Sequence, residues 1–269
     1  MTTPNDRALA GGLLPQDPAR EAEFDAYAER YDHLLNESLR LSGERGEYFT
    51  DYKIRDLVGL WRSLGPEPGA GPANPRILDF GAGVGASIPS FQQHLPTARL
   101  TCADVSERSL RLAERRFGAA ATFAQCAGAE LPFATGSFDL AYAACVFHHI
   151  PAERHESVLR ELHRVLRPGG ALMLYEHNPW NPVVVRVVRG CPFDERAILI
   201  PAPALRRQVR AAGFRQVVVT HRVFFPRPLH ALRWLEPALG WLPLGAQYHV
   251  VGRKLPTASD GLSPLASPG

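Results

Sequence analysis

The chain has 269 residues, of which 45% are hydrophobic and 21% are charged. This composition is that of a globular protein with enough apolar residues for one large core, and it excludes a disordered or fibrous chain. The formal net charge is only +3, and the arginines are scattered among acids, so we expect no nucleic-acid partner.

The sequence carries no signal for secretion, membrane insertion or metal binding. The N-terminus lacks the basic and apolar regions of a signal peptide, and no stretch reaches the ~20 apolar residues of a membrane span. We therefore expect a soluble cytoplasmic protein. We further expect it to be a monomer or a homodimer. Cys102, Cys126, Cys145 and Cys191 show no CxxC spacing, so we expect reduced thiols and no metal site.

Helical patterns dominate the first part of the chain. Residues 1–20 are rich in Pro, Gly and polar residues and are predicted to form a flexible tail, as are residues 256–269. Apolar residues recur at helical spacing over residues 21–36 and again in IRDLVGLW. This predicts an N-terminal helical cap over residues 21–64, which a Pro- and Gly-rich break, GPEPGAGPANP, separates from the rest.

Strands and helices alternate after this break. Five apolar runs are predicted as strands: RILDF, ARLTCAD, ATFAQC, FDLAYAACVF and ALMLYE. Their continuous apolar character is typical of strands that helices cover on both faces. Two more strand-like runs, FRQVVVTHRVFF and QYHVVGRK, are expected to pair antiparallel. We predict an α/β domain over residues 76–255: a Rossmann-like, doubly wound, mostly parallel sheet with an antiparallel C-terminal edge strand and substrate-facing insertions within 177–245.

A glycine-rich loop follows the first predicted strand of the sheet. Its glycines, Gly81, Gly83 and Gly85, let the backbone pass close to a ligand, and Asp104 ends the next strand, where its carboxylate can accept both hydroxyls of a ribose. This spacing also suits a nicotinamide dinucleotide. Asp79 argues against that alternative, because an acid beside a pyrophosphate is costly, whereas an acid suits a ligand with an ammonium group.

Four segments in order resemble the motifs of the class I S-adenosylmethionine-dependent methyltransferases: ILDFGAGVG, ADVS, ELPFATGSFDLAYAACVFHHI and LHRVLRPGGALMLYE. The resemblance covers roughly residues 76–176 and extends loosely to FDAYAERYD. It implies S-adenosylmethionine as the cofactor and S-adenosylhomocysteine as its product. The cofactor-binding residues that it implies are Tyr31, Asp79, Gly81, Gly83, Gly85, Asp104, Val105, Ala127, Gly128 and Cys145.

The resemblance also gives these residues separate roles. The three glycines pass beside the methionine part of the cofactor, the backbone near Cys145 binds its amino group, and the ring of Tyr31 closes over the sulfonium cation. Many relatives have an Asp for the adenine amino group where this chain has Ala127. We therefore expect adenine to bind backbone groups at Ala127 and Gly128 and to pack against apolar side chains.

Two histidines near the ends of predicted strands are candidates for the catalytic base, His177 and His149. Each has a structural alternative: His149 can pack under the cofactor with its neighbour His148, and His177 can be a turn histidine bonded to backbone. Glu176 is not expected to orient His177, because adjacent strand residues point in opposite directions. The segment NPWNP is predicted to form a stiff loop that holds His177 and Trp180 beside a substrate.

The acceptor has a weak signature. Aromatic residues within 21–64 and 177–245 predict a pocket for a small hydrophobic or ring-containing molecule, namely Tyr27, Tyr48, Phe49, Tyr52, Trp180, Phe193, Phe224, Phe225 and Trp234. We expect in-line methylation of an O, N or C nucleophile, in specialised metabolism. The open alternatives are cyclisation or decarboxylation with bound S-adenosylmethionine, methylation of RNA or protein, a non-enzymatic partner subunit and a nicotinamide dehydrogenase.

Overall fold

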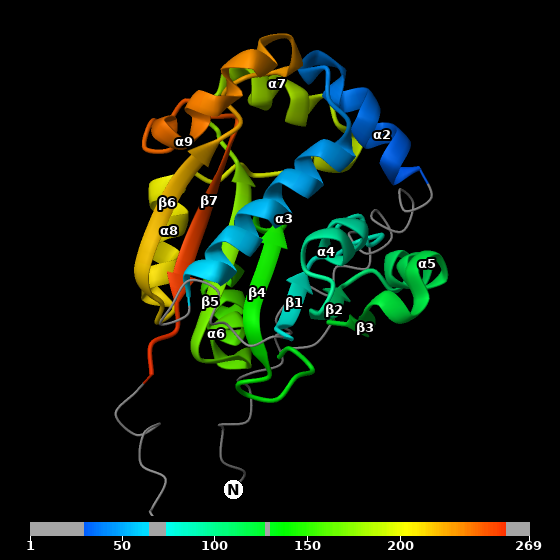
Figure 1. The fold of residues 1–269 in the computed structure, drawn as a ribbon, viewed down its shortest axis with the longest axis vertical. Coiled ribbons are helices and arrows are strands. Elements are labelled where there is room, and N and C mark those ends of the chain that lie inside the picture. The colour runs from blue at the N-terminus through cyan, green and yellow to red at the C-terminus, as the bar shows by residue number, and fades with distance from the viewer. Residues whose placement is uncertain (1–29, 65–73, 127–129, 257–269) are drawn as a thin grey trace, which may run out of the picture.

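A single seven-stranded sheet with helices on both faces forms the centre of the molecule (Figure 1). The computed structural model describes residues 30–64, 74–126 and 130–256, so the tails predicted at 1–20 and 256–269 lie almost wholly outside the described residues. The strands are β1 (Arg76–Phe80), β2 (Arg99–Asp104), β3 (Thr122–Gln125), β4 (Phe138–Ala144), β5 (Leu166–His177), β6 (Arg215–Arg222) and β7 (Gln247–Arg253). The α-helices are α2 (Tyr31–Ser38), α3 (Gly46–Ser63), α4 (Ile88–His94), α5 (Glu107–Phe117), α6 (His155–Val165), α7 (Pro182–Arg189), α8 (Ala202–Ala211) and α9 (Glu236–Leu239).

The strand order is β3-β2-β1-β4-β5-β7-β6. The first five strands of this order are parallel to their neighbours, whereas β7 runs antiparallel to both β5 and β6. This confirms the predicted doubly wound, mostly parallel sheet with antiparallel pairing of the two C-terminal strands. Because β7 lies between β5 and the edge strand β6, its first residue, Gln247, becomes the register partner of His177.

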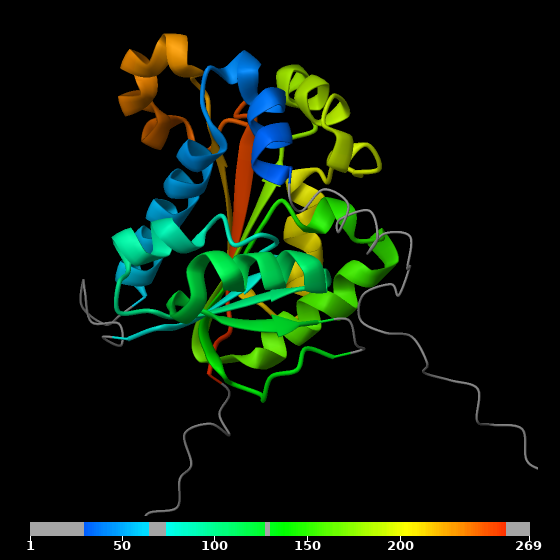
Figure 2. The same cartoon turned by 90° about the vertical axis from the view of Figure 1, so that its right-hand side faces the viewer.

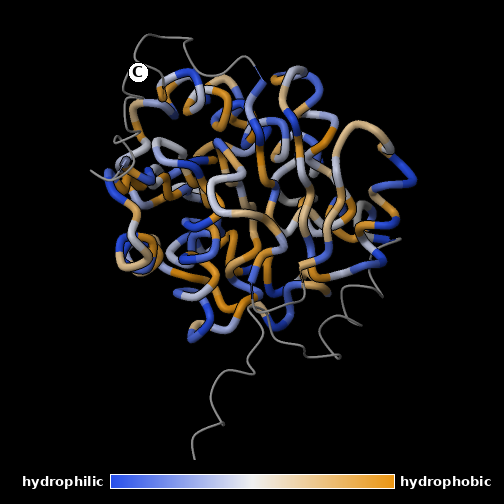
Figure 3. The backbone as a smooth tube through the Cα atoms, turned by 90° about the horizontal axis from the view of Figure 1, so that it is seen from below, coloured by the Kyte–Doolittle hydropathy of each residue, from blue (hydrophilic) through white to orange (hydrophobic). Residues whose placement is uncertain are grey.

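Alternate residues of the central strands supply two apolar layers. In β5, Leu172 and Leu174 pack into one core with α6 and α8, whereas Met173 and Tyr175 pack into the other with α3 and α4. Both faces of this strand are therefore buried, which explains its continuous apolar sequence. The view along the sheet shows the two helical layers, and hydrophobic segments concentrate in the interior of the tube drawing (Figures 2 and 3).

The stiff loop predicted after His177 is short, because a helix begins almost at once. The side chain of Asn181 accepts hydrogen bonds from the backbone N–H groups of Val183 and Val184, and Pro182 occupies the first turn of α7. An Asn cap followed by proline is a favourable helix start, since the proline needs no hydrogen-bond acceptor for its nitrogen. Within the described ranges, no helix combines the length and the hydrophobicity that crossing a membrane requires.

A cap lies above the carboxyl ends of the strands and combines segments from both halves of the chain. It consists of α2, the first part of α3, α7, the 3-10 helix η6 (Arg227–Leu235) and α9, and the rest of α3 runs down across one face of the sheet (Figures 1 and 2). Asp56 of α3 accepts hydrogen bonds from the guanidinium of Arg222 in β6, one of them 2.8 Å long, and from the hydroxyl of Tyr175 in β5. These bonds fasten the long cap helix to two strands of the sheet.

We expect Asp56→Ala to lower the free energy of unfolding by about 3 kcal/mol, because it leaves the largely buried Arg222 guanidinium without its counter-charge. Denaturant titration followed by circular dichroism measures the loss. The control is Arg111→Ala, which breaks a solvent-exposed pair with Glu107 and is expected to cost about 1 kcal/mol or less. Equal, small losses in both variants would show that the Asp56 cluster contributes no more than a surface ion pair.

Candidate active site

A cavity of about 270 Å³ opens at the carboxyl ends of β1, β2, β4 and β5, beneath α2 and α3. The predicted site residues that line it are Asp79, Gly81, Gly83, Asp104, Val105, Cys145, His149 and His177. Gly85 does not line it. The side chain of Tyr31 is not described, and Ala127 and Gly128 lie outside the described residues.

The three loop glycines have different surroundings, although all have positive φ angles of +53° to +77°. A Cβ atom on Gly81 would lie 2.3 Å from the side chain of Val146, and one on Gly85 would lie 2.8 Å from that of Ile88. A Cβ atom on Gly83 would meet no atom within 4 Å. Gly81 and Gly85 are thus required by packing and conformation, whereas Gly83 presents bare backbone to open space beside the cavity.

Asp104 is held rigidly at the end of β2. Its Oδ2 atom accepts the N–H of Gly83 at 2.8 Å, and its Oδ1 atom accepts the N–H of Ser106 at 2.9 Å. These bonds connect the carboxylate to the glycine loop and to the start of α5. Each carboxylate oxygen has more than one lone pair, so Asp104 can also accept hydroxyl groups of a ligand in the cavity.

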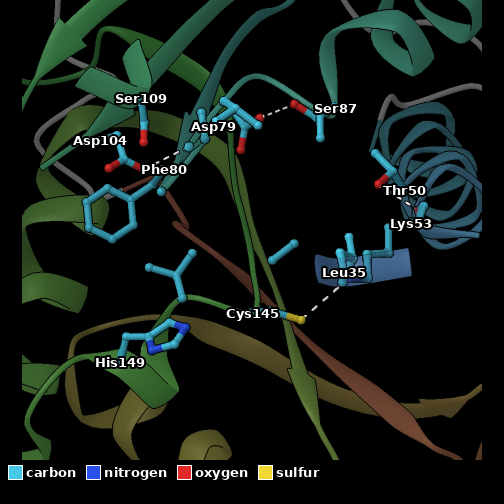
Figure 4. A pocket seen from close by; sticks show the side chains of 18 of the residues that line it. Leu35, Thr50, Lys53, Asp79, Phe80, Ser87, Asp104, Ser109, Cys145 and His149 are labelled. Carbon is cyan, nitrogen blue, oxygen red and sulfur yellow. Dashed lines mark hydrogen bonds between the residues drawn. The ribbon is translucent and has the colours of Figure 1, made fainter. Parts of the chain in front are cut away.

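Asp79 is buried at the end of β1 and faces the same cavity. The close-up view shows its carboxylate pointing at the hydroxyl of Ser87, which donates a hydrogen bond to it (Figure 4). Burial raises the pKa of Asp79 to about 7, the Ser87 hydrogen bond partly opposes this shift, and the charge of Asp104 adds to it. At neutral pH a carboxyl with this pKa is only partly ionised, and a cationic ligand group would stabilise its ionised form.

Cys145 follows β4 and has an unusual backbone conformation, with φ of +60°. Its N–H donates to the carbonyl of Tyr175 at 2.8 Å, which leaves its own carbonyl as the group that can accept a hydrogen bond from an ammonium. A non-glycine residue with positive φ costs about 1–3 kcal/mol, and such strain clusters at functional sites. The backbone at Cys145 therefore fits the role that the resemblance implies.

Lys53 is a cavity residue to which the sequence analysis gave no role. Its Nζ atom lies 3.5 Å from the Sγ atom of Cys145. Burial raises the pKa of the Cys145 thiol, but the positive charges of His177 and Lys53 outweigh it and lower that pKa to about 7. The sequence could have indicated this position, because Lys53 lies four residues before Leu57 and therefore on the apolar face of the predicted helix.

His177 ends β5 and lines the cavity, where its Nδ1 atom lies 3.5 Å from the amide nitrogen of Gln247. Glu176 does not orient it, as the alternation of strand side chains predicts. The buried carboxylate of Glu176 instead accepts the Nδ1 hydrogen of His148 at 2.6 Å and the backbone N–H of Phe147 at 2.8 Å. His177 and Glu176 thus belong to different parts of the site.

Asp194 joins the two adjacent histidines. Its Oδ1 atom lies 3.4 Å from Nε2 of His148 and 3.2 Å from Nε2 of His149. Burial lowers the pKa of His148, but the carboxylates of Glu176 and Asp194 outweigh it and raise that pKa well above its ordinary value. Burial lowers the pKa of His149. His148 is therefore the buried member of the pair, and His149 reaches the cavity wall.

Apolar side chains complete the wall that faces the cap. Phe49 and Phe193 line the cavity together with Leu35 and Leu39 from the N-terminal helices. Other aromatic residues of the predicted pocket lie elsewhere: Trp180 is 50% exposed and lies beside a separate shallow hollow, and Trp234 is 76% exposed. Of the two residues that the loop was expected to hold beside a substrate, His177 lines this cavity and Trp180 does not.

The cavity thus has two chemically different ends (Figure 4). Asp79, Asp104 and the glycine loop form a polar end with bare backbone, and the close-up places His149 across the cavity from them. One end can hold the hydroxyl and ammonium groups of a cofactor, while the other combines imidazoles with an apolar wall and can accept a second molecule.

Comparison with known proteins agrees with this arrangement. A family model described as a methyltransferase domain matches residues 77–170. The chain is 30% identical to the ubiquinone/menaquinone biosynthesis C-methyltransferase UbiE of Desulfotalea psychrophila, over 74% of this chain and 72% of that protein. It is 31% identical to the demethylmenaquinone methyltransferase of Thermus thermophilus, over 71% of this chain and 90% of that protein.

A solved structure with the same architecture is a SAM-dependent methyltransferase of Thermotoga maritima, described as a possible histamine N-methyltransferase. It superposes with a TM-score of 0.60 at 19% identity, over 87% of this chain and 99% of that one. At this identity the similarity shows the fold alone.

Proposed function

Because this chain belongs to the class I S-adenosylmethionine-dependent methyltransferases, we propose that it methylates a ring carbon of a small apolar acceptor of the quinol type. The names of the two relatives, a C-methyltransferase and a demethylmenaquinone methyltransferase, support a quinone acceptor over the specialised metabolite that the sequence suggested. The division of one cavity into a polar, glycine-lined end and an end with an apolar wall supports the proposal most directly.

The polar end fits S-adenosylmethionine, which supplies an activated methyl group when bound. Gly83 leaves open space where the backbone can approach the methionine part, and Asp104 has lone pairs for the ribose hydroxyls. Asp79 and the carbonyl of Cys145 would hold the ammonium group. The buried carboxyl of Asp79 supports this fit, because burial raises its pKa and a neighbouring ammonium group would stabilise its ionised form.

The other end would bind and orient the acceptor. Leu35, Phe49 and Phe193 would exclude water and pack against a planar ring, since aromatic and aliphatic walls favour such ligands. Orientation of the reacting atoms can contribute ~7–11 kcal/mol in favourable cases. His177, which lines the cavity, would take a proton from an acidic hydroxyl of the acceptor, and the resulting oxyanion makes the adjacent ring carbon more nucleophilic.

The direct experiment is incubation of the purified chain with S-adenosylmethionine and a short-chain naphthoquinol. We expect S-adenosylhomocysteine and a ring-methylated product in equal amounts by mass spectrometry. Product formation without S-adenosylhomocysteine would support the alternative of cyclisation or decarboxylation. Binding of S-adenosylhomocysteine without turnover of any quinol would exclude this acceptor class and leave the family assignment intact.

Cofactor affinity is expected to fall with acid, because Asp79 must be ionised to pair with the ammonium group. Its pKa of about 7 means that most of the carboxyl is ionised at pH 7.5 and little of it at pH 5.5. An α-amino group has a pKa of about 8, so it is mostly charged at pH 7.5 and almost fully charged at pH 5.5. Calorimetric titration with S-adenosylhomocysteine should show affinity falling about tenfold per pH unit below pH 7, since one pKa unit corresponds to about 1.4 kcal/mol.

Asp79→Asn is the control for this pH dependence. The variant should bind weakly at every pH and show a flat profile, because the amide cannot ionise. A profile that keeps its slope in Asp79→Asn would assign the titration to another group that lines the cavity, such as His149.

A further inference from the structure

Three donor atoms meet at the edge of the cavity, from His148, His149 and Asp194. The carboxylate Oδ1 of Asp194 lies 3.4 Å and 3.2 Å from the Nε2 atoms of the two histidines. The donor atoms that these three side chains offer all lie within 4.8 Å of one another. In a tetrahedral zinc site the ligand atoms lie ~2.0–2.1 Å from the ion and therefore about 3.3 Å from one another. The two distances from Asp194 to the histidines already have this length.

The orientation of His148 is that of a supported metal ligand. Its Nδ1 atom donates a hydrogen bond to the carboxylate of Glu176, with 2.6 Å between nitrogen and oxygen. The same carboxylate accepts hydrogen bonds from the backbone N–H groups of Val146 and Phe147. A carboxylate that is hydrogen-bonded to one ring nitrogen fixes the orientation of the imidazole and makes its other nitrogen more basic. Zinc-bound histidines usually have such a partner. In this arrangement Nε2 is the only atom of the ring that can reach a ligand.

That Nε2 atom is fully buried and has no hydrogen-bond partner within the described residues. The carboxylate oxygen Oδ1 of Asp194 lies 3.4 Å from it, beyond the distance of a good hydrogen bond. A buried polar nitrogen without a partner costs free energy that a bound ion would recover. This observation is independent of the clustering of the three side chains and points to the same ligand.

We propose that His148, His149 and Asp194 bind a divalent transition-metal ion of the zinc class. Two imidazoles and one carboxylate select zinc, cobalt or nickel over magnesium and calcium, which prefer oxygen ligands. His149 and Asp194 also line the cavity, so an ion that they hold would be accessible from it, as in catalytic rather than structural zinc sites. The site does not depend on the identity of the methyl acceptor.

No sequence motif indicates this site, because its ligands come from two segments that lie 45 residues apart. The histidine pair belongs to the 3-10 helix Phe147–His149, and Asp194 ends the 3-10 helix Pro192–Asp194. The backbone N–H of Ile198 donates to the carbonyl of His148 at 2.9 Å, which holds the two segments together. The cluster therefore exists only once the fold has formed.

The test uses the full chain without an affinity tag, stripped of metal and titrated with Co²⁺. We expect one ion per chain and the intense visible absorption of four-coordinate cobalt, lost on addition of Zn²⁺. His149→Ala and Asp194→Asn should each weaken binding by more than the roughly 10–100-fold that loss of a supporting residue typically causes. His230→Ala, an exposed histidine outside the cluster, is the control and should bind as the unmodified chain does.

Calorimetry with S-adenosylhomocysteine and thermal unfolding verify that each variant is folded. No saturable Co²⁺ binding by the unmodified chain would overturn the proposal and leave the cluster as a protonated histidine between two carboxylates. Equal binding by the unmodified chain and both variants would also overturn it. If Cys145→Ser loses Co²⁺ binding and the His149 and Asp194 variants keep it, the ion binds the thiol, and this result would also overturn the proposal.

Discussion

Replacing His177 with alanine is expected to lower kcat by ~10²–10⁴-fold, the usual contribution of a positioned acid–base group, while the affinity for S-adenosylhomocysteine changes little. The side chain lies at the end of β5 and lines the cavity away from the glycine loop and Asp104. Its removal would therefore affect the acceptor and its proton rather than the cofactor. Steady-state kinetics with the quinol, together with calorimetry, measure the two effects separately.

The variant His177→Gln separates proton transfer from positioning. Glutamine can hydrogen-bond to an acceptor but cannot take its proton at neutral pH. We expect this variant to recover acceptor KM without recovering kcat. If His177→Ala lowers kcat and cofactor affinity equally, or lowers neither, the residue only shapes the cavity and is not catalytic.

Replacing Asp104 with alanine is expected to weaken binding of S-adenosylhomocysteine by ~10²–10⁴-fold. Hydrogen bonds to a charged group contribute about 1.5–3 kcal/mol each, and two ribose hydroxyls would lose theirs together. The variant also loses the bond from Asp104 to the N–H of Gly83, which shapes the glycine loop. Calorimetry measures the affinity, and a loss below tenfold would show that the ribose does not depend on this carboxylate.

A pair of glycine variants separates loss of the ligand from damage to the loop. In Gly83→Ala the new methyl group meets no protein atom and occupies open space, so affinity should fall more than stability. In Gly85→Ala the methyl group meets Ile88 and Ala113 at 2.8 and 3.0 Å, so thermal stability should fall first. Both positions have positive φ angles, which makes the backbone cost of alanine comparable.

The fold and the cofactor end were predictable because their signals are local. The continuous apolar runs predict buried parallel strands, and the glycine loop, Asp79 and Asp104 all follow directly from one strand–turn–helix unit and the next strand. In contrast, the segment VVVRVVR was not predicted as a helix. Its β-branched residues favour strands, and the Asn181 cap with Pro182 decides the outcome locally.

The end of the cavity that we propose for the acceptor was only partly predictable, because long-range pairing assembles it. Gln247 reaches His177 only because β7 inserts beside β5, and Asp194 reaches His149 through a short helical turn that carries no motif. Lys53 joins the cavity because α3 lies across the sheet, fastened by Asp56. Each of these contacts depends on the fold, whereas the residue types alone are common.

The fastening of the cap has a consequence for how the protein can diversify. The residues that match the family model, 77–170, contain the whole polar end of the cavity. Leu35, Phe49, His177 and Phe193 lie outside this span on both sides, and the Asp56–Arg222 pair joins the two flanking parts to each other. Natural variation can therefore exchange the acceptor while inheriting the methyl donor, provided that the N-terminal and C-terminal segments change together. Chimeras that swap only one flank between relatives should lose the acceptor specificity of both parents.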